Sequence, residues 1–313
     1  MLVSAVGFGC MGISHAYGEP MEKKDAIKLL RDAFENGYTF FDTAECYVGD
    51  DSNNEQIVGE ALAPFGNNVQ IATKFGIKHE GSSLICDSRL ETIRKSAEGS
   101  LRRLGVERID LYYQHRIDTK VPAEEVAGVM SELIKEGKIA HWGVSEADEE
   151  YLRKAHAVCP QNRYSMMFRE YEKLFPVLEE LNIGFVAFSP LANGFLSAKY
   201  NIGTTFESDK DYRREMPQFQ KEAYEQNAAF VRLLKSIAAE RNATTAQIAL
   251  AWLIGKRPYI VPIPGTTKTE RVKENADAAK IELSQDEIRK IDGILNCIEM
   301  SAVFGGHNRR VEE

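Results

Sequence analysis

The sequence has few cysteines, no long hydrophobic run and no excess of positive charge. Its five cysteines lie far apart and form no CxxC pair, which argues against a disulfide framework and against a thiolate zinc site. No apolar stretch approaches the roughly 20 residues of a membrane helix, and the apolar start lacks the basic residue that opens a signal peptide. We therefore expect a cytoplasmic protein without a metal site and without a membrane partner.

Charge and composition exclude further classes of protein. Among 313 residues, 39 are Lys or Arg and 47 are Asp or Glu, which gives a net charge of −8. An acidic chain is a poor general binder of nucleic acid, although a small basic pocket for one phosphate stays possible. Hydrophobic residues make up 43% and charged residues 27%, a balance typical of globular proteins. No low-complexity segment or linker divides the chain, so we expect a single domain over residues 1–313.

Short β-rich runs alternate with amphipathic helical patterns along the chain. The predicted strands cover residues 6–10, 39–43, 69–75, 109–115, 139–145, 161–166, 183–189 and 259–264. The predicted helices cover residues 22–36, 54–62, 88–104, 123–136, 149–157, 172–181, 224–240, 244–254, a stretch from about 269, and 284–298. A long polar connection covers residues 192–222. Eight strand–helix units favour one α/β fold, a closed (β/α)8 TIM barrel with extra helices and long substrate and cofactor loops, whose chemistry lies at the carboxyl ends of the strands.

The run GFGCMG at residues 7–12 spells the GxGxxG fingerprint of open dinucleotide-binding sheets. That fingerprint requires a helix that opens at its third glycine, whereas the next helical pattern here begins near Glu22. We therefore interpret these glycines as positions where the first strand packs closely and where a ligand can approach its end.

Four polar residues lie at the ends of three consecutive predicted strands. Asp42 closes the second strand and Tyr47 follows in the loop, while Lys74 closes the third strand and His115 the fourth. A phenol with a pKa of about 10 is a poor acid or base near neutral pH, and a nearby cation favours its phenolate. We expect Lys74 to supply that charge, Asp42 to orient the lysine and His115 to orient a carbonyl group, so that the group transfers a proton to a carbonyl oxygen.

Seven runs occur in the order typical of one family: GFGCMG, FFDTAECY, IATKFG, RRLGVERIDLYYQHR, GKIAHWGVSEA, AFSPLANGFLSAKY and IPGTTKTERVKEN. Together they resemble the aldo-keto reductase superfamily, in its branch of bacterial-type aldehyde reductases and potassium-channel β subunits. The resemblance implies a barrel that binds a nicotinamide cofactor without a Rossmann fold. It also implies that Asp42, Tyr47, Lys74 and His115 are the catalytic tetrad, with Tyr47 as the general acid.

The resemblance further implies a set of residues that bind NADP(H). Ser145 and Gln161 are similar to the pair that holds the nicotinamide carboxamide, and Phe188 to the ring that stacks on the nicotinamide. The other expected cofactor residues are Asp42 and residues of three segments, namely the loop after the first strand, the segment over the pyrophosphate and the adenosine site. These residues are Gly9, Cys10, Met11, Ser189, Leu191, Asn193, Gly194, Lys199, Gly265, Thr266, Thr267, Lys268, Arg271, Glu274 and Asn275. Lys268 and Arg271 favour NADP(H) over NAD(H), because they add charge for a 2′-phosphate next to a helix start.

The sequence departs from the family pattern in two places. Glu146 follows Gly143-Val144-Ser145 where most members have Asn, which leaves the second carboxamide contact open. Few residues precede the first strand, so the usual N-terminal hairpin is expected to be shortened. The polar tail at residues 301–313 can cover the pocket or be disordered.

Three functions fit these residues. The first is NADPH-dependent reduction of an aldehyde or ketone, a small carbonyl substrate, with hydride from nicotinamide C4 and a proton from Tyr47. The second is an NADPH-binding regulatory or sensor subunit with little turnover. The third is a Schiff-base lyase with Lys74 as the nucleophile. Cys46, beside Tyr47, is either a redox-sensitive thiol or a small packing residue.

Overall fold

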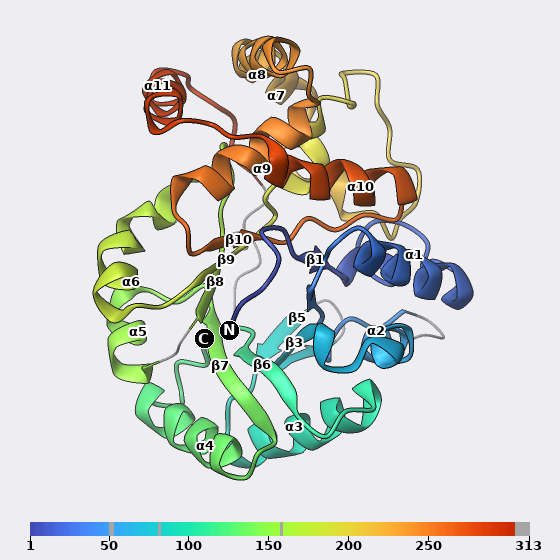
Figure 1. The fold of residues 1–313 in the computed structure, drawn as a ribbon, viewed down its shortest axis with the longest axis vertical. Coiled ribbons are helices and arrows are strands. Elements are labelled where there is room, and N and C mark those ends of the chain that lie inside the picture. The colour runs from blue at the N-terminus through green and yellow to red at the C-terminus, as the bar shows by residue number, and fades with distance from the viewer. Residues whose placement is uncertain (50–52, 81–82, 157–158, 304–313) are drawn as a thin grey trace.

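An eight-stranded parallel sheet forms the centre of the molecule. The computed structural model describes residues 1–49, 53–80, 83–156 and 159–303, and the sheet has the order β1-β2-β3-β6-β7-β8-β9-β10. The strands are Phe8–Gly9 (β1), Phe40–Asp42 (β2), Gln70–Phe75 (β3), Ile109–Gln114 (β6), Ile139–Ser145 (β7), Cys159–Arg163 (β8), Phe185–Phe188 (β9) and Ile260–Pro262 (β10). Backbone N–H groups of Gly7 and Gly9 donate to the carbonyl oxygens of Pro262 (2.9 Å) and Pro264 (3.2 Å) and so join the two edges. The sheet curls into a barrel, which confirms the predicted fold class (Figure 1).

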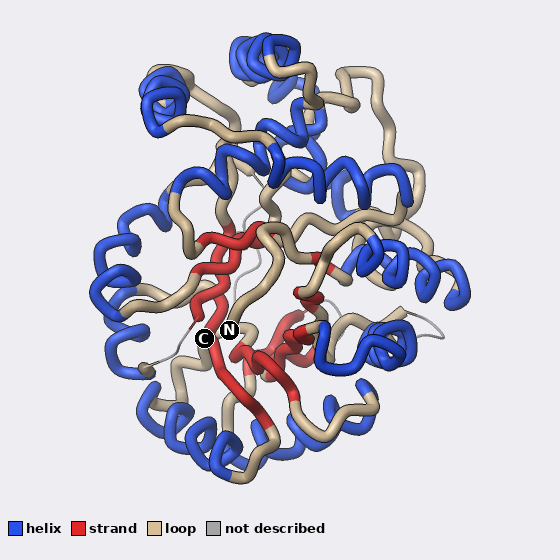
Figure 2. Tube along the Cα trace, in the orientation of Figure 1, coloured by secondary structure: helices blue, strands red, loops and turns tan. Residues whose placement is uncertain are grey.

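Helices surround this sheet (Figure 2). They are Lys23–Glu35 (α1), Asn54–Leu62 (α2), Leu90–Leu104 (α3), Ala123–Lys135 (α4), Glu149–Ala155 (α5), Phe175–Leu181 (α6), Lys221–Gln226 (α7), Ala228–Glu240 (α8), Thr245–Lys256 (α9), Thr269–Asp277 (α10) and Gln285–Leu295 (α11). Figure 1 shows α7, α8 and α11 outside the ring that the other helices form. Within the described residues, no helix has the length and apolar composition that crossing a bilayer requires.

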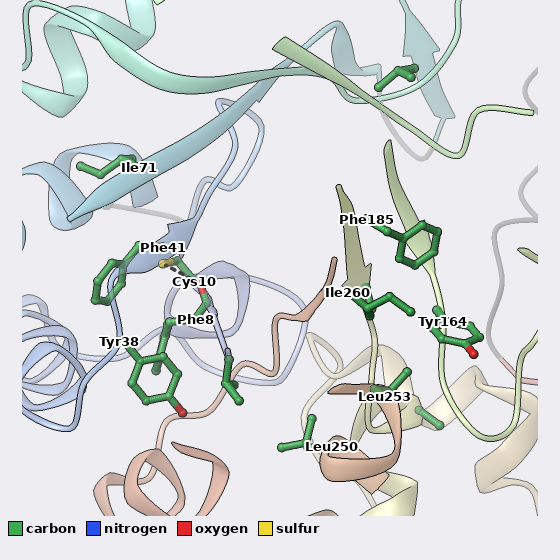
Figure 3. Packing of buried hydrophobic residues seen from close by; sticks show 14 of the residues in the cluster. Phe8, Cys10, Tyr38, Phe41, Ile71, Tyr164, Phe185, Leu250, Leu253 and Ile260 are labelled. Carbon is green, nitrogen blue, oxygen red and sulfur yellow. Dashed lines mark hydrogen bonds between the residues drawn. The ribbon is translucent and has the colours of Figure 1, made fainter. Parts of the chain in front are cut away.

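Helix α9 shows why the outer helices are needed. Its residues are buried on nearly every side, because the barrel covers one face and α8 and α11 cover the other. A capping box at Thr244 and Gln247 starts the helix by satisfying two free backbone N–H groups. Leu253 lies in the same buried cluster as Ile260 of β10 and Phe185 of β9 (Figure 3).

Gly9 is required where the two edges of the barrel meet. A Cβ atom on Gly9 would lie 2.7 Å from the carbonyl oxygen of Ile263, closer than such atoms can approach. No helix opens at Gly12, because a short 3-10 turn, Met11–Ile13, follows β1 and the first α-helix begins at Lys23. The GFGCMG run is therefore a site of close strand packing and not a Rossmann fingerprint.

Several predicted boundaries differ from the structure. The strand predicted at 161–166 is β8, Cys159–Arg163, because the chain leaves the sheet at Tyr164 and turns through a bridge between Ser165 and Phe168. The helix predicted at 224–240 is two helices, α7 and α8. They meet at Asn227, whose side chain donates to Ser301 Oγ (2.8 Å) and accepts from the Ser301 N–H (3.0 Å).

The sequence patterns also missed an antiparallel hairpin between β3 and α3. Its strands are Ile77–Glu80 (β4) and Ser83–Cys86 (β5), and Ile77 pairs with Cys86. Gly76 permits the turn out of β3, because its φ of 90° lies in the left-handed region. The hairpin therefore continues from the carboxyl end of β3, where the chemistry was expected.

Residues 1–7 contain no strand, and Val3 packs against a second buried cluster that includes Phe40, Leu111 and Val186. Of the polar tail, residues 304–313 lie outside the described part of the chain.

Candidate active site

A cavity of about 570 Å³ opens at the carboxyl ends of the strands. Residues at or just after the ends of β1, β2, β6, β7, β8, β9 and β10 line it. This is the edge at which parallel α/β barrels carry their chemistry.

Lys74 and Asp42 form a buried ion pair beneath this cavity. The Nζ atom of Lys74 lies 2.5 Å from Asp42 Oδ1, and the two side chains are 1% and 4% exposed. Nζ also donates to the backbone carbonyl of Thr43 (2.7 Å) and lies 3.5 Å from the Tyr47 hydroxyl. Adjacent strands fix this arrangement, because β2 and β3 pair in parallel with Asp42 opposite Ala72. Lys74 is therefore held by hydrogen bonds and by an opposite charge, as a buried ammonium requires.

A second set of contacts holds Asp42 from the opposite side of the barrel. Gln161 of β8 donates from Nε2 to Asp42 Oδ2 at 2.7 Å. Behind β2, Thr43 donates to the side chain of Asn54 (2.6 Å), which in turn donates to the Cys10 carbonyl (3.0 Å) and to Ser14 Oγ (2.5 Å). The start of α2 is thereby tied to the loop after β1, and the strand end with Asp42 is fixed between them.

Tyr47 lies between two histidine rings. The His115 ring is edge-on to the Tyr47 ring with centroids 5.9 Å apart, and the His15 ring lies roughly parallel to it at 6.3 Å. Cys46 Sγ lies 3.5 Å from Nδ1 of His115. The four residues predicted as a tetrad are therefore close together in space.

The Tyr47 phenol behaves differently from the sequence-based expectation. Burial raises its pKa well above the usual tyrosine value, and the nearby Asp42 charge raises it further, while Arg116 opposes both effects. The charge of Lys74 does not make the phenol more acidic than usual, as the sequence predicted, because Asp42 lies 2.5 Å from the ammonium and offsets it. The phenol keeps its proton at neutral pH, which suits a proton donor.

Nearly all the predicted cofactor residues line the same cavity. They are Gly9, Met11, Asp42, Ser145, Gln161, Phe188, Ser189, Leu191, Asn193, Gly194, Lys199, Gly265, Thr266, Thr267, Lys268, Arg271, Glu274 and Asn275. Cys10 does not line it: its side chain is fully buried, and Sγ points to the Phe8 carbonyl oxygen at 3.7 Å (Figure 3). Cys10 follows β1 in a helical backbone conformation (φ −81°, ψ −11°). The Cys10 side chain does not reach the cavity, and the assignment of Cys10 to the cofactor site stays a prediction.

Residues 191–199 and α10 face each other across the cavity. Lys199 Nζ lies 4.0 Å from Glu274 Oε2. Asn193 donates to the Tyr17 hydroxyl at 2.9 Å and accepts from Gln218 at 3.2 Å, which ties this segment to the loop after β1. Residues of this segment therefore line the cavity beside the end of α10 that holds Glu274.

The start of α10 is suited to an anion. Lys268 precedes the helix and Arg271 lies in its first turn, where free backbone N–H groups attract negative charge. No hydrogen bond or ion pair of either side chain occurs within the described residues. Both are thus able to contact a phosphate.

Glu146 has a role that the sequence did not reveal. It follows β7 with a φ of 58°, an uncommon conformation for a residue with a side chain. Its carboxylate contacts two arginines: Oε2 lies 3.3 Å from Nε of Arg116, and Oε1 lies 2.9 Å from Nη2 of Arg163. Glu146 is therefore an anchor for two cations at the cavity wall.

Sequence reasoning missed several lining residues. His15, Arg116 and Arg163 line the cavity, as do Ile77 and Cys86 of the β4–β5 hairpin. The sequence does contain signals for the two arginines. Arg116 follows His115 directly, and Arg163 lies two residues after Gln161, so that it shares the same face of β8.

Comparison with known proteins decides the family. The sequence profile of the Aldo/keto reductase family matches residues 5–296. The chain belongs to the aldo/keto reductase family. It is an aldo-keto reductase oxidoreductase with the barrel of that family, whose members are NAD(P)H-dependent carbonyl reductases.

Three relatives show how far the similarity extends. A probable aldo-keto reductase 1 from Glycine max is 39% identical over 97% of this chain and 88% of its own. The structure of a glycerol dehydrogenase from Gluconobacter oxydans matches with a TM-score of 0.85 at 30% identity, over 95% of this chain and 92% of the other. An aldo/keto reductase from Klebsiella pneumoniae, solved in complex with NADP and acetate, matches with a TM-score of 0.71 at 26% identity, over 93% and 91%.

Proposed function

We propose that this aldo/keto reductase uses NADPH to reduce a small aldehyde or ketone to an alcohol. The observation that carries the proposal is the convergence of Asp42, Tyr47, Lys74 and His115 at the end of a cavity lined by the residues expected to bind the cofactor. The complex of the Klebsiella relative with NADP supports the choice of cofactor. On the sequence motifs, we place the chain in the branch of bacterial-type aldehyde reductases and potassium-channel β subunits.

The cavity fits a nicotinamide nucleotide chemically. Phe188 offers an aromatic face at the end of β9, and Gln161 has a carbonyl oxygen left to accept from an amide, because its amide nitrogen binds Asp42. Lys268 and Arg271 at the start of α10 would hold the 2′-phosphate, and Gly194 and Lys199 would cover the pyrophosphate. When bound, NADPH supplies a hydride from C4 of its nicotinamide.

The side chains of this protein then orient the carbonyl group and donate the proton. His115 would orient the carbonyl oxygen toward Tyr47. Tyr47 would donate its phenolic proton to that oxygen as the negative charge develops, and the Lys74 ammonium, 3.5 Å away, would stabilise the phenolate that remains. Asp42 and Gln161 keep the ammonium in position.

The same geometry weighs against a Schiff-base lyase. A lysine that attacks a carbonyl group must be uncharged, whereas Lys74 donates to both Asp42 and the Thr43 carbonyl. Both contacts use N–H groups of Lys74 and keep its nitrogen directed at Asp42 and Thr43, not at an incoming carbonyl carbon.

The decisive experiment monitors NADPH absorbance with a panel of aldehydes and ketones, in parallel with NADH. We expect consumption of NADPH by the wild-type protein and a loss of at least a thousandfold in kcat for Tyr47→Phe, with NADPH binding retained by fluorescence. NADPH binding without turnover on any carbonyl compound would instead favour a sensor subunit. Normal turnover of Tyr47→Phe would contradict the assigned proton donor.

A further inference from the structure

Two arginines share one carboxylate at the cavity wall. Arg116 and Arg163 both contact Glu146, through Nε at 3.3 Å and Nη2 at 2.9 Å. Two guanidinium groups share one directly paired carboxylate in this cluster, and Glu170 also acts on Arg163 without an ion pair. The other carboxylates at the cavity are engaged elsewhere, since Asp42 pairs with Lys74 and Glu274 lies against Lys199.

The two arginines differ in their access to solvent. Arg163 is 4% exposed and lies over the rings of Phe168 (4.7 Å) and Phe188 (5.6 Å). Within the described part of the chain, its buried Nη1 atom has no hydrogen-bond partner. A buried cation with an unused donor is costly, so Arg163 is a fixed positive charge behind the cavity wall.

Arg116 carries positive charge to the part of the cavity where His115 lies. Its side chain is 31% exposed, and its guanidinium lies 5.9 Å from the centre of the Phe188 ring. Nη1 donates to the His115 carbonyl (2.6 Å) and to Ser145 Oγ (3.1 Å). These contacts fix one edge of the guanidinium beside His115, the residue that orients the carbonyl group. Within the described residues, no hydrogen bond uses Nη2.

The surroundings of Arg116 are otherwise weakly polar. Its charge acts on Tyr47, Cys46 and Cys86, whose side chains line the cavity with Ile77. These side chains form an uncharged wall on one side of the cavity, and Arg116 is a fixed cation on the other side. This combination suits a short carbonyl compound with an anionic end. A guanidinium binds a carboxylate in preference to a neutral group, because its planar donors match the two oxygens.

We propose that Arg116, held by Glu146 beside Arg163, is a specificity-determining residue that selects carbonyl substrates carrying a carboxylate. This inference rests on the proposed reductase function and names the substrate class of the same site. The carboxylate would contact Nη2 of Arg116, and Arg163 would supply a fixed second charge behind it.

A matched pair of aldehydes tests the proposal. The kcat/KM values for 5-oxopentanoate and pentanal are measured with NADPH for the wild-type protein, Arg116→Gln and Arg116→Lys. The control is Arg94→Gln, which removes an arginine of α3 that pairs with Glu132 and Glu136. We expect the wild-type protein to prefer 5-oxopentanoate by at least tenfold, about the size of one charge-assisted hydrogen bond. The preference should fall about tenfold in Arg116→Gln, recover in part in Arg116→Lys and persist in Arg94→Gln. Hydration of the aldehydes is the same for every variant, so a change in the ratio reports on the protein.

A binding measurement separates failure of this inference from failure of the proposed function. Pentanoate and pentanamide are titrated by calorimetry into the NADPH-saturated protein, where no turnover is needed. Tighter binding of pentanoate to the wild-type protein than to Arg116→Gln would support the inference even if no aldehyde were reduced. Equal binding of the acid and the amide would overturn the inference. An equal loss of both aldehyde activities in Arg116→Gln, together with weaker NADPH binding, would also overturn it and would show that Arg116 acts on the cofactor.

Discussion

The ammonium of Lys74 lies 2.5 Å from the carboxylate of Asp42, and both side chains are almost completely buried. Removing one partner from such a pair leaves the other charge without compensation. The pair also determines the state of the neighbouring phenol, because the field of the cation at Tyr47 is opposed by that of the carboxylate. Together with burial, this holds the pKa of Tyr47 above its usual value.

The raised pKa of Tyr47 predicts how the rate of reduction changes with pH at alkaline pH. A proton donor is active below its pKa and is lost as the pH rises through it. We therefore expect kcat for reduction to show no tyrosine-dependent fall up to about pH 10, the ordinary pKa of the side chain, and to decline above it. Rates of NADPH consumption at saturating aldehyde measure this profile.

Asp42→Asn is the informative variant for that profile. Without the carboxylate, the Lys74 charge would act on Tyr47 unopposed, so the decline should move to lower pH. A wild-type decline centred below pH 9, or an unchanged profile in Asp42→Asn, would contradict the electrostatic assignment.

Arg271 and the choice of dinucleotide give a second prediction. Arg271→Ala should weaken NADPH binding about 10- to 100-fold, because charge-assisted hydrogen bonds contribute roughly 1.5–3 kcal/mol. Binding of NADH should change little, since it has no 2′-phosphate. Fluorescence titration with both nucleotides measures the difference.

Lys273→Ala is the matched control for charge. Lys273 is on the same helix but pairs with Asp277. An equal loss of NADPH affinity in both variants would indicate a general charge effect and not a specific contact.

The cysteines should differ sharply in reactivity. Burial raises the pKa of the Cys46 thiol to about 12, so almost no thiolate forms at pH 8. Cys297 is exposed. We expect a thiol-specific disulfide reagent at pH 8 to label Cys297 first and Cys46 much more slowly, as measured by peptide mass mapping. Labelling of Cys46 as fast as Cys297 would support the alternative of a redox-sensitive thiol.

Two helical glycines should respond in opposite directions to the same substitution. A Cβ atom on Gly59 of α2 would collide with the backbone of Leu104 at the end of α3, whereas Gly128 of α4 faces open space. Gly59→Ala should destabilise the protein by about 1–3 kcal/mol through overpacking. Gly128→Ala should stabilise it by about 0.5–1 kcal/mol, because alanine is the better helix former. Urea unfolding measures both, and equal effects would contradict the tight α2–α3 contact.

Local patterns were enough to predict most elements. The predicted ranges 54–62 and 139–145 coincide with α2 and β7, because Asn53 caps the start of α2 and Gly137 separates α4 from β7. The family motifs predicted the four residues that lie close together at the cavity. The alternation of strands and helices predicted the barrel.

The sequence by itself determined the order of elements, the barrel and the strand ends that carry the polar residues, because these depend on neighbours in the chain. Only the tertiary structure decided the partners of Glu146, the place of the β4–β5 hairpin at the cavity and the direction of the Tyr47 pKa shift. Each of these depends on contacts between segments far apart in sequence, such as Glu146 with Arg116 and Lys74 with Asp42. Burial and charge at such contacts arise only when the barrel closes.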